Sequence, residues 1–309
     1  MFERGFDSMP EREASEDAVY LGIDGGGTKC SAVLMTGERQ VLGSGIAGPA
    51  NPFQGFGQSI ESIEAATFAA LEDAGQGREM LRHVVAGVGL AGVNLPRVHE
   101  SVSEWSHPFG HMFLTTDLEI ACYGAHGGRD GAVIVAGTGS SGCSMTDGKT
   151  TIVGAHGFPF GDTGSGAWIG LEAVRAVLLQ VDGLGPRTTL SERLSRALNA
   201  NGVSIVERMM GARPREFASL AGLVFAAADA GDDVATDITS RGCSYLNDVA
   251  RQLLATDPPA ISLLGGLRDL VLPRLDEDIA ARMSPPEHAP DVGAIIYAQR
   301  KHQDLLEAA

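Results

Sequence analysis

A turn of three glycines and a threonine between two apolar segments is the part of this sequence best suited to chemistry. Residues 19–24 read as a strand that ends on Asp24, residues 25–28 (Gly-Gly-Gly-Thr) form the turn, and residues 31–36 read as a second strand. Glycines allow positive φ and let bare N–H groups reach phosphate oxygens, while Thr28 adds a hydroxyl donor. Asp24 can hold a magnesium ion through water. The turn therefore predicts a cradle for ATP·Mg²⁺, with an ordinary tight hairpin as the alternative.

Two familiar phosphate loops do not fit this turn. The Walker pattern ends in Gly-Lys-Ser or Gly-Lys-Thr, but here Thr28 precedes Lys29, and Gly22 lies inside the strand. The dinucleotide-binding fingerprint needs another glycine and then a helix, whereas Cys30 stands at that position and opens a strand. Lys29 follows the turn and could touch a phosphate, but we expect it on a solvated strand edge.

The chain repeats this strand–turn–strand pattern in its second half. Residues 132–137 read as an apolar strand, residues 137–140 (Gly-Thr-Gly-Ser) as a turn, and residues 141–146 as another strand. The interval between Gly27 and Gly137 is about the length of a small domain. Two related lobes that each carry a phosphate turn are therefore the simplest organisation, and the pair of turns favours a phosphate clamp over two unrelated hairpins.

The composition is that of an acidic globular protein. With 309 residues, 44% hydrophobic and 20% charged, the chain can form two domains with substantial cores. A net charge of −16 disfavours nucleic acid and anionic membranes as partners. There is no apolar run of about 18 residues that could span a membrane, and residues 1–18 are polar and mixed in charge rather than a signal peptide. We expect a cytoplasmic protein with an acidic, partly ordered tail over 1–18.

The cysteines and histidines show no spacing typical of metal or redox sites. The four cysteines lie far apart in the sequence: Cys30, Cys122, Cys143 and Cys243. Reduced, buried structural thiols are the expectation. His107 and His111 are four residues apart, but Pro108 and Gly110 predict a loop there rather than a zinc-binding helix.

Short apolar runs that alternate with amphipathic stretches predict an α/β chain. Strands are expected at 19–24, 31–36, 41–46, 83–89, 112–116, 132–137, 141–146, 150–154 and 260–264. Helices are expected near 57–74, 96–106, 117–127, 164–181 and 291–305, with a mostly helical insertion over 186–258. Functional sites in such folds gather at strand ends, which is where the glycine motifs fall.

With these motifs in order, the sequence resembles the sugar kinases of the actin, hexokinase and Hsp70 superfamily, within the BadF/BadG/BcrA/BcrD ATPase-like family. It is most similar to bacterial glucosamine kinases and N-acetylglucosamine kinases. The motifs that carry the likeness are 24–28, Thr115-Thr116-Asp117, Gly124-Ala125-His126, 137–140, 158–167 and Leu264-Gly265-Gly266. The likeness covers nearly all of 19–300. It implies two ribonuclease H-like (actin-like ATPase) lobes, with an interdomain cleft for nucleotide and sugar.

The resemblance also implies lobe boundaries and residue roles. The N-terminal lobe is expected over 19–117 with the C-terminal helix at about 291–309, and the C-terminal lobe over 118–290. The implied ATP phosphate-binding residues are Gly25, Gly26, Gly27, Thr28, Gly137, Thr138, Gly139 and Ser140, with Gly265 and Gly266 at the adenosine. The implied sugar-binding residues are Asn51, Asp117, His156, Gly157, Asp162 and Ser165. Asp117 is the implied catalytic base, and Asp24 the residue associated with Mg²⁺.

Several of these residues could instead have a purely structural role. Asp117 follows a strand and opens a helix, where a carboxylate is either a base or a helix N-cap; the resemblance favours the base. Asp162 precedes another helix and has the same alternative. Asn51 stands in a proline-rich turn that could simply reverse the chain, and the pair Gly265-Gly266 could be a strand-end turn.

The function that the resemblance implies is transfer of the γ-phosphate of MgATP to the 6-hydroxyl of glucosamine or N-acetylglucosamine. Asp117 would accept the hydroxyl proton while Mg²⁺ and the two turns hold the spreading negative charge. His156 aligns with a tryptophan of animal-type N-acetylglucosamine kinases, which leaves open how the 2-substituent is recognised. Dimers are common among such proteins, so a homodimer is also an open expectation.

Two other functions use the same fold. An ATPase activator of a 2-hydroxyacyl-CoA dehydratase or benzoyl-CoA reductase would need clustered cysteines for an iron–sulfur cluster, and the cysteines here are isolated. A non-enzymatic sugar sensor or repressor would need a basic helix-turn-helix or a zinc–cysteine module, and the sequence shows neither.

Overall fold

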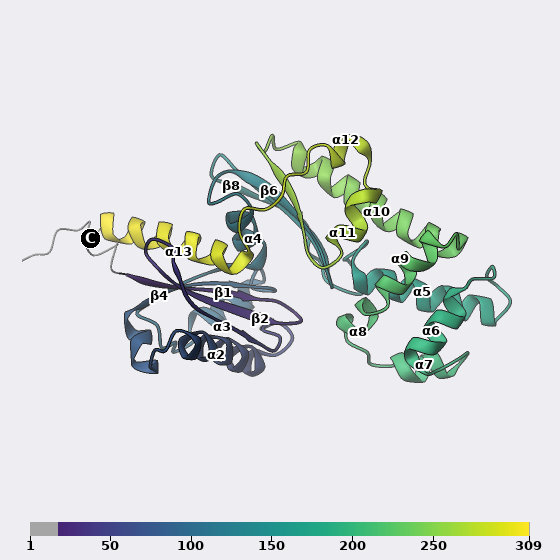
Figure 1. Ribbon diagram of the computed structural model, residues 1–309, viewed down its shortest axis with the longest axis horizontal. Coiled ribbons are helices and arrows are strands. Elements are labelled where there is room, and N and C mark those ends of the chain that lie inside the picture. The colour runs from purple at the N-terminus through teal and green to yellow at the C-terminus, as the bar shows by residue number, and fades with distance from the viewer. Residues whose placement is uncertain (1–17, 309) are drawn as a thin grey trace, which may run out of the picture. The chain divides into compact units, whose positions relative to one another are not determined.

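The computed structural model describes residues 18–308, and the acidic tail predicted over 1–18 lies outside them except for Ala18. The chain divides into two units (Figure 1): unit 1 comprises the residues up to Gly128 together with those from Glu287 onward, and unit 2 comprises Arg129–Pro286. The expected lobe boundary after residue 117 differs from this division. The helix that begins there, α4 (Asp117–Ala125), packs against the C-terminal helix α13 (Pro290–Glu307) and therefore belongs to unit 1.

Unit 1 contains a five-stranded mixed sheet in the order β3-β2-β1-β4-β5. Its strands are β1 (Val19–Gly25), β2 (Cys30–Thr36), β3 (Val41–Ala47), β4 (Val84–Leu90) and β5 (His111–Thr116). The first three strands form an antiparallel meander, whereas β4 and β5 run parallel to β1. Because parallel strands end at the same edge of a sheet, the segments that follow β1, β4 and β5 all leave from one side of unit 1.

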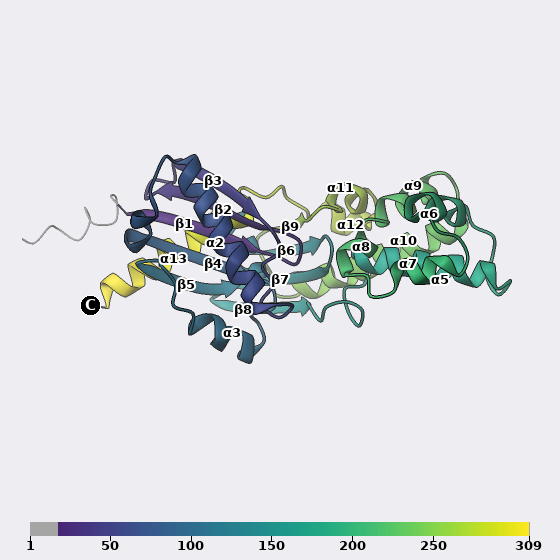
Figure 2. The same cartoon turned by 90° about the horizontal axis from the view of Figure 1, so that it is seen from below.

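Helices cover both faces of this sheet, as Figure 1 shows for α2 (Phe56–Asp73) and α13. Side chains alternate along β1: Leu21 and Ile23 pack in the cluster under α2, while Tyr20 packs with Ile295 of α13 on the opposite face. Figure 2 shows α2 running across the strands from the other direction. The remaining regular elements of unit 1 are the short 3₁₀ helix η1 (Arg78–His83) and the helix α3 (Pro96–Ser103).

Glycines let α13 approach the sheet closely. A Cβ atom at Gly22 would lie 1.9 Å from the carbonyl oxygen of Asp291, and one at Gly87 would lie 2.0 Å from that of Ala294. On α13 itself, a Cβ at Gly293 would lie 2.0 Å from the Ile120 carbonyl oxygen of α4. A larger residue at Gly22 or Gly87 would force α13 away from β1 and β4, and one at Gly293 would force α13 away from α4.

Unit 2 repeats the first four strands of unit 1. Its strands are β6 (Gly131–Ala136), β7 (Ser140–Thr146), β8 (Lys149–Gly154) and β9 (Ile261–Leu264). They are ordered β8-β7-β6-β9, with an antiparallel meander and one parallel strand beside its first member. In both units the first strand of the meander thus lies between its hairpin partner and a parallel strand, which is the repeat that the two turns predicted.

The helices of unit 2 form a layer beside and beyond this sheet. They are α5 (Gly166–Val181), α6 (Leu190–Leu198), α7 (Ser204–Met209), α8 (Pro214–Ala218), α9 (Ala221–Asp229), α10 (Asp233–Leu254), α11 (Arg268–Val271), the 3₁₀ turn η2 (Leu272–Arg274) and α12 (Glu277–Ala280). A Cβ at Gly142 of β7 would lie 2.8 Å from Val249 and from Leu253, so α10 packs directly on the sheet.

The structure confirms the expected order of strands and helices, including the helical insertion, which consists of α6 to α10. The short elements η1, α11, η2 and α12 were not expected, because pieces of three to six residues are too short to show a helical period. All four cysteines are free and buried, as predicted. Among residues 18–308, every helix is too short or too polar to cross a membrane.

The close approach of α13 generates a stability prediction. Gly22→Ala would place a methyl group on the Asp291 carbonyl oxygen, so we expect the free energy of unfolding to fall by about 3 kcal/mol or more. Gly57→Ala in α2 is the matched control, because a Cβ there meets nothing within 4 Å; its stability should stay equal or rise by less than about 1 kcal/mol. Urea denaturation measures both. Equal losses of unfolding free energy in the two variants would contradict the close packing of α13 against the sheet.

Candidate active site

Asp24 lies near the C-terminal end of β1, on the face of the sheet that α13 covers. It pairs across the parallel ladder with Gly89 of β4, and Gly89 pairs with Thr115 of β5. Asp24 and Thr115 therefore stand two strands apart in one row, about 10 Å between Cα atoms. Asp117 follows Thr115 by two residues and is the first residue of α4. The carboxylate predicted for metal and the carboxylate predicted as base are thus brought to the same edge of unit 1.

Gly89, between them, lets α4 reach the sheet. A Cβ at Gly89 would lie 2.3 Å from Cδ1 of Ile120, so the Ile120 side chain fills the space over this glycine. Since Ile120 is one turn along α4 from Asp117, this contact fixes the start of the helix beside the end of β4.

Asp117 is not the N-cap of α4. Thr116 is the cap residue, and its hydroxyl accepts a hydrogen bond from the backbone N–H of Glu119 at 3.1 Å. The Glu119 carboxylate in turn accepts hydrogen bonds from the hydroxyls of Thr115 and Thr116. Asp117 accepts one from the adjacent N–H of Leu118 at 3.0 Å. The capping role that competed for Asp117 therefore belongs to its neighbour.

The electrostatics of this edge are unfavourable for negative charge. Burial is the main cause that raises the pKa of Asp24 to about 7; the charges of Asp117 and Asp291 raise it further, and Lys29 opposes the shift. Burial likewise raises the pKa of Asp117 to about 6, against its backbone hydrogen bonds. Within residues 18–308, no ion pair joins any of the three aspartates to a basic side chain. A cation or a proton would relieve this repulsion.

Asp291 is the residue that the sequence analysis missed. It stands in the first turn of α13 after Pro290, where its carboxylate accepts the N–H of Val292 at 2.9 Å. An aspartate in the first turn of a helix is ordinary, so the sequence offers no signal of its effect on Asp24. Only the packing of α13 across Gly22 reveals it.

The turn after β1 is held by backbone hydrogen bonds at its base. The Gly26 N–H donates to the Lys29 carbonyl at 3.0 Å, and the Gly26 carbonyl accepts from Ala50 at 2.9 Å. Gly27, Thr28 and Lys29 are exposed at the tip, as expected for Lys29. Glycines allow positive φ, but Gly25, Gly26 and Gly27 do not use that region in this turn. Glycine is needed at position 25 for another reason: a Cβ there would collide with Leu90 and Ala50.

Asn51 lies beside this turn, one residue after Ala50. Its side-chain oxygen accepts the backbone N–H of Phe53 at 3.0 Å, which closes a turn of the kind that the sequence offered as an alternative. The loop after β4 packs on it, because a Cβ at Gly92 would lie 2.8 Å from that same oxygen. The side-chain amide nitrogen of Asn51 takes no part in this turn.

The turn after β6 is anchored on the start of α5. The Gly137 and Thr138 carbonyls accept hydrogen bonds from the N–H groups of Gly166 and Ala167 at 2.8 and 3.2 Å. Gly137 N–H donates to the Gly139 carbonyl at 2.9 Å, which closes the turn. Neither glycine of this turn has positive φ. Thr138 and Gly139 retain partial exposure, so their groups remain within reach of a ligand.

Asp162 ties this turn to the loop that precedes α5. Its carboxylate accepts backbone hydrogen bonds from Ser140, Gly157 and Phe158, and a Cβ at Gly139 would lie 2.8 Å from one of its oxygens. Burial raises the pKa of Asp162, mainly opposed by these hydrogen bonds. The residue has φ of 62°, a left-handed conformation that aspartate tolerates. Asp162 therefore holds two candidate ligand-binding loops at a fixed separation.

Two serines predicted at the site use their hydroxyls inside unit 2. Ser165 is fully buried and caps α5, accepting the N–H of Trp168 at 3.1 Å. Ser140 is buried and donates to the Thr163 carbonyl at 2.8 Å. These contacts account for both hydroxyls, and a fully buried Ser165 side chain presents no surface to a sugar. His156 and Gly157 lie on the same loop, with the His156 side chain exposed.

The glycine pair after β9 lies against the turn of β6. Gly265 has φ of 97°, and a Cβ there would lie 2.3 Å from the Ala136 carbonyl oxygen, so only glycine fits. Gly266 has open space around it. Unit 2 thus brings together the turn at 137–140, the loop at 156–162 and the pair Gly265-Gly266. Unit 1 brings together Asp24, the turn at 25–28, Asn51 and Asp117.

These two units have the fold of the actin-like ATPase kinases. A solved structure from Chromobacterium violaceum, provisionally named an N-acetylglucosamine kinase, is similar to this chain with a TM-score of 0.84 and 27% identity. The similarity covers 92% of this chain and 99% of that one. The model of the BadF/BadG/BcrA/BcrD ATPase family matches residues 21–298, and the chain belongs to this family.

Curated relatives of this chain are kinases of amino sugars by name. A glucosamine kinase of Vibrio cholerae serotype O1 is 30% identical over 288 residues, which are 93% of this chain and 98% of the relative. An N-acetylmuramic acid/N-acetylglucosamine kinase of Clostridium acetobutylicum is 27% identical over 253 residues, 79% of each chain. The resemblance inferred from the motifs is confirmed. The family supports use of ATP, and these relatives support sugar kinase activity.

The contacts of Ser165 generate a second prediction. Ser165→Ala removes the cap of α5, so the free energy of unfolding should fall by about 1 kcal/mol, measured by urea denaturation. Because the hydroxyl is buried away from any ligand, the KM for an amino sugar should change by less than about twofold in a kinase assay. A large rise in that KM with unchanged stability would contradict the cap and restore the sugar-binding role.

Proposed function

We propose that this protein is an amino-sugar kinase that transfers the γ-phosphate of ATP to the 6-hydroxyl of glucosamine or N-acetylglucosamine. The observation that carries the proposal is the Asp117 carboxylate, which is free of the capping role and has its pKa raised to about 6 at the end of β5. A carboxylate of this kind is ionised near neutral pH and basic enough to accept a hydroxyl proton. The names of the curated relatives support an amino sugar as the acceptor.

In the proposed reaction, Asp117 orients the sugar hydroxyl and accepts its proton as the oxygen attacks the γ-phosphorus in line. Phosphoryl transfer asks a protein mainly for positioning and for stabilisation of negative charge. The exposed tip of the Gly25–Thr28 turn would contact that charge from unit 1, while the Gly26 N–H holds the base of the turn. Asn51, anchored next to this turn through Ala50, would contact sugar hydroxyls with its amide nitrogen.

Asp24 fits a role at magnesium. Asp24 is half-buried, forms no ion pair within residues 18–308, and carries a pKa raised to about 7 in spite of the opposing charge of Lys29. A divalent cation nearby would stabilise the ionised form. Mg²⁺ gives up its waters reluctantly, so Asp24 would hold the ion through water. When bound with ATP, the ion would neutralise phosphate charge.

Unit 2 would contribute the second phosphate turn, the adenosine contacts and part of the sugar contacts. The partly exposed turn residues Thr138 and Gly139 are the proposed phosphate contacts of unit 2, next to Ser140, whose hydroxyl donates to the Thr163 carbonyl. Gly265 and Gly266 would let the backbone pass close to the adenosine. Asp162 would act mainly by holding the Gly139 turn and the Gly157 loop at their spacing, because its carboxylate already accepts backbone hydrogen bonds from both.

The alternative of an ATPase activator has less support. That function would use clustered cysteines, and the four cysteines of this chain are buried and free, two in each unit. A sugar sensor without catalysis would not need an elevated carboxylate pKa at the strand edge, which is a feature of sites that move protons.

The proposal is tested by ADP release from MgATP with glucosamine, N-acetylglucosamine, glucose, N-acetylmannosamine or no sugar. We expect turnover with glucosamine or N-acetylglucosamine to exceed the sugar-free rate by at least about a hundredfold, because water should be a poor substitute for a positioned hydroxyl. ADP release that is equally fast in every reaction, including the one without sugar, would contradict the kinase and favour an ATPase switch.

The pH dependence follows from the raised pKa of Asp117. A general base works in its ionised form, so kcat/KM for MgATP at saturating sugar should rise about tenfold per pH unit below about pH 6 and level off above it. Excess magnesium would favour the ionised forms of ATP and of Asp24 across this range. Circular dichroism at each pH controls for unfolding. A rate that stays flat down to about pH 5 would contradict Asp117 as the base.

A further inference from the structure

Tyr245 of α10 stands beside the loop that Asp162 holds, although it belongs to none of the motifs in the sequence. A Cβ at Gly154, the last residue of β8, would lie 3.1 Å from the Tyr245 hydroxyl oxygen and 3.6 Å from the Ser140 carbonyl oxygen. Burial, and then the charge of Asp162, raise the pKa of the Tyr245 phenol. The hydroxyl therefore lies close to the end of β8, to the start of β7 and to Asp162, all within unit 2.

The position of Tyr245 is fixed by the packing of α10 on the loop before α5. A Cβ at Gly164 would lie 2.6 Å from the Gly242 carbonyl oxygen and 3.1 Å from Cγ of Leu246. Tyr245 is three residues after Gly242 and directly before Leu246, so it shares the face of α10 that meets this loop. The helix and the loop therefore hold the Tyr245 backbone in a fixed place beside Asp162.

The Tyr245 hydroxyl is available to a ligand. Within residues 18–308 it forms no hydrogen bond with a protein group, and its side chain is partly exposed. Because burial and a neighbouring charge raise its pKa further above neutral, the phenol keeps its proton and can donate it in a hydrogen bond. The hydroxyls of the other three tyrosines of the chain have protein partners, which are His302 for Tyr20, Arg300 for Tyr123 and the Leu114 carbonyl for Tyr297.

We propose that Tyr245 is a further sugar-binding residue, whose hydroxyl donates a hydrogen bond to a hydroxyl oxygen of the amino sugar. This inference rests on the proposed kinase function, because it concerns the same site. A neutral acceptor fits better than a phosphate oxygen, since the Asp162 carboxylate places a negative charge beside the phenol and would repel phosphate. A sugar hydroxyl can accept from Tyr245 and carries no charge.

Tyr245→Phe tests this role, because it removes the hydroxyl and keeps the ring. The KM for the amino sugar should rise about three- to tenfold, as expected for the loss of one neutral hydrogen bond, while kcat and the KM for MgATP stay within about twofold. Calorimetric titration of the sugar should show the same loss of affinity without depending on turnover. Unchanged sugar affinity, or a rise in the KM for MgATP instead of the sugar, would overturn the proposal.

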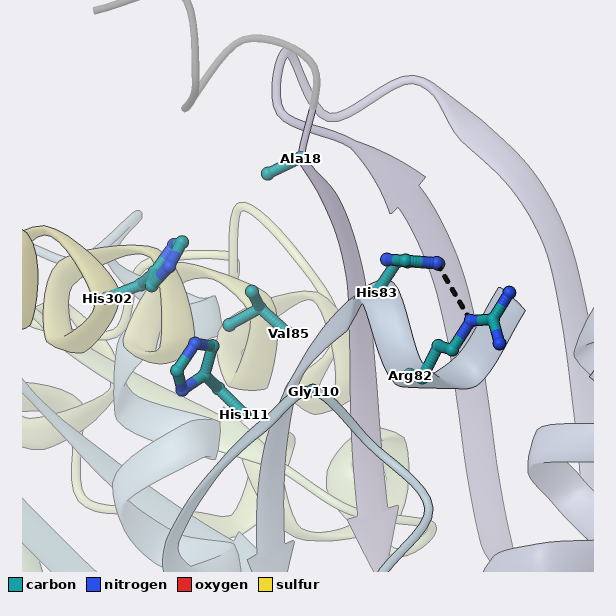
Figure 3. Close-up of a pocket in the computed structure, with 7 residues that line it drawn as sticks. All are labelled: Ala18, Arg82, His83, Val85, Gly110, His111 and His302. Carbon is teal, nitrogen blue, oxygen red and sulfur yellow. Dashed lines mark hydrogen bonds between the residues drawn. The ribbon is translucent and has the colours of Figure 1, made fainter. Parts of the chain in front are cut away.

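Tyr20→Phe is the matched control, because it removes a phenol hydroxyl far from the candidate site. Tyr20 lies at the N-terminal end of β1, whereas Asp24 lies near the other end of that strand. Its hydroxyl is 3.2 Å from Nδ1 of His302, which lines the pocket shown in Figure 3. This variant should leave both KM values unchanged, and circular dichroism shows that each variant is folded. An equal rise of the sugar KM in both variants would contradict a specific contact with Tyr245.

Deoxy analogues of the sugar identify the hydroxyl that Tyr245 contacts. Wild type should lose affinity for the analogue that lacks this hydroxyl, and Tyr245→Phe should lose about three- to tenfold less, because its share of the interaction is already gone. The 1-, 3-, 4- and 6-deoxy analogues are compared by calorimetry. Losses that simply add to that of Tyr245→Phe for all four analogues would contradict the proposed hydrogen bond.

The same measurements separate the role of Tyr245 from the proposed function. Wild-type protein that neither binds nor phosphorylates any amino sugar would contradict the kinase and this contact together. Wild-type protein that phosphorylates an amino sugar, with the same sugar KM and calorimetric affinity in Tyr245→Phe, would leave the kinase in place and overturn only the role of Tyr245.

Discussion

The candidate site depends on the close packing of α13 and α4 against one face of the first sheet. Gly22 and Gly87 let α13 lie against β1 and β4, and Gly89 does the same for α4 through Ile120. This packing brings Asp24, Asp117 and Asp291 to one edge of unit 1. Without the glycines the two helices would stand farther out, and three carboxylates from distant parts of the sequence would not influence one another.

The clustered carboxylates destabilise the folded protein and at the same time provide groups that can bind a cation or accept a proton. Burial raises the pKa of Asp24 and Asp117, and the charges of Asp117 and Asp291 raise that of Asp24 further, which means that ionising these groups near neutral pH destabilises the folded protein. No basic side chain among residues 18–308 offsets the repulsion by an ion pair. Natural proteins keep such unfavourable charge where function uses it. A magnesium ion beside Asp24 and a hydroxyl proton on Asp117 are the ligands that would relieve it.

The elements and the repeated turns could be predicted because they rest on local signals. Strands with glycine turns, the helical insertion and the isolated cysteines are all visible as patterns along the chain. The sequence could not show Asp291 acting on Asp24, because a first-turn aspartate is common and the contact depends on α13 crossing Gly22. The sequence also could not show whether the hydroxyls of Ser140 and Ser165 stabilise the fold or bind a ligand. Both form hydrogen bonds with groups more than two residues away in the chain. The sequence also could not show that Gly25 is required by close packing against Leu90 and Ala50 rather than by a positive φ.

The most direct test of the account compares wild type with Asp117→Asn in amino-sugar phosphorylation and in MgATP binding. Asparagine keeps the shape of the side chain but cannot accept the hydroxyl proton. The account predicts that kcat falls by about a thousandfold or more, while MgATP affinity is retained and stability at neutral pH does not fall, because a buried charge has been removed. A variant that binds MgATP normally and still phosphorylates the sugar at near wild-type rate would contradict the central claim.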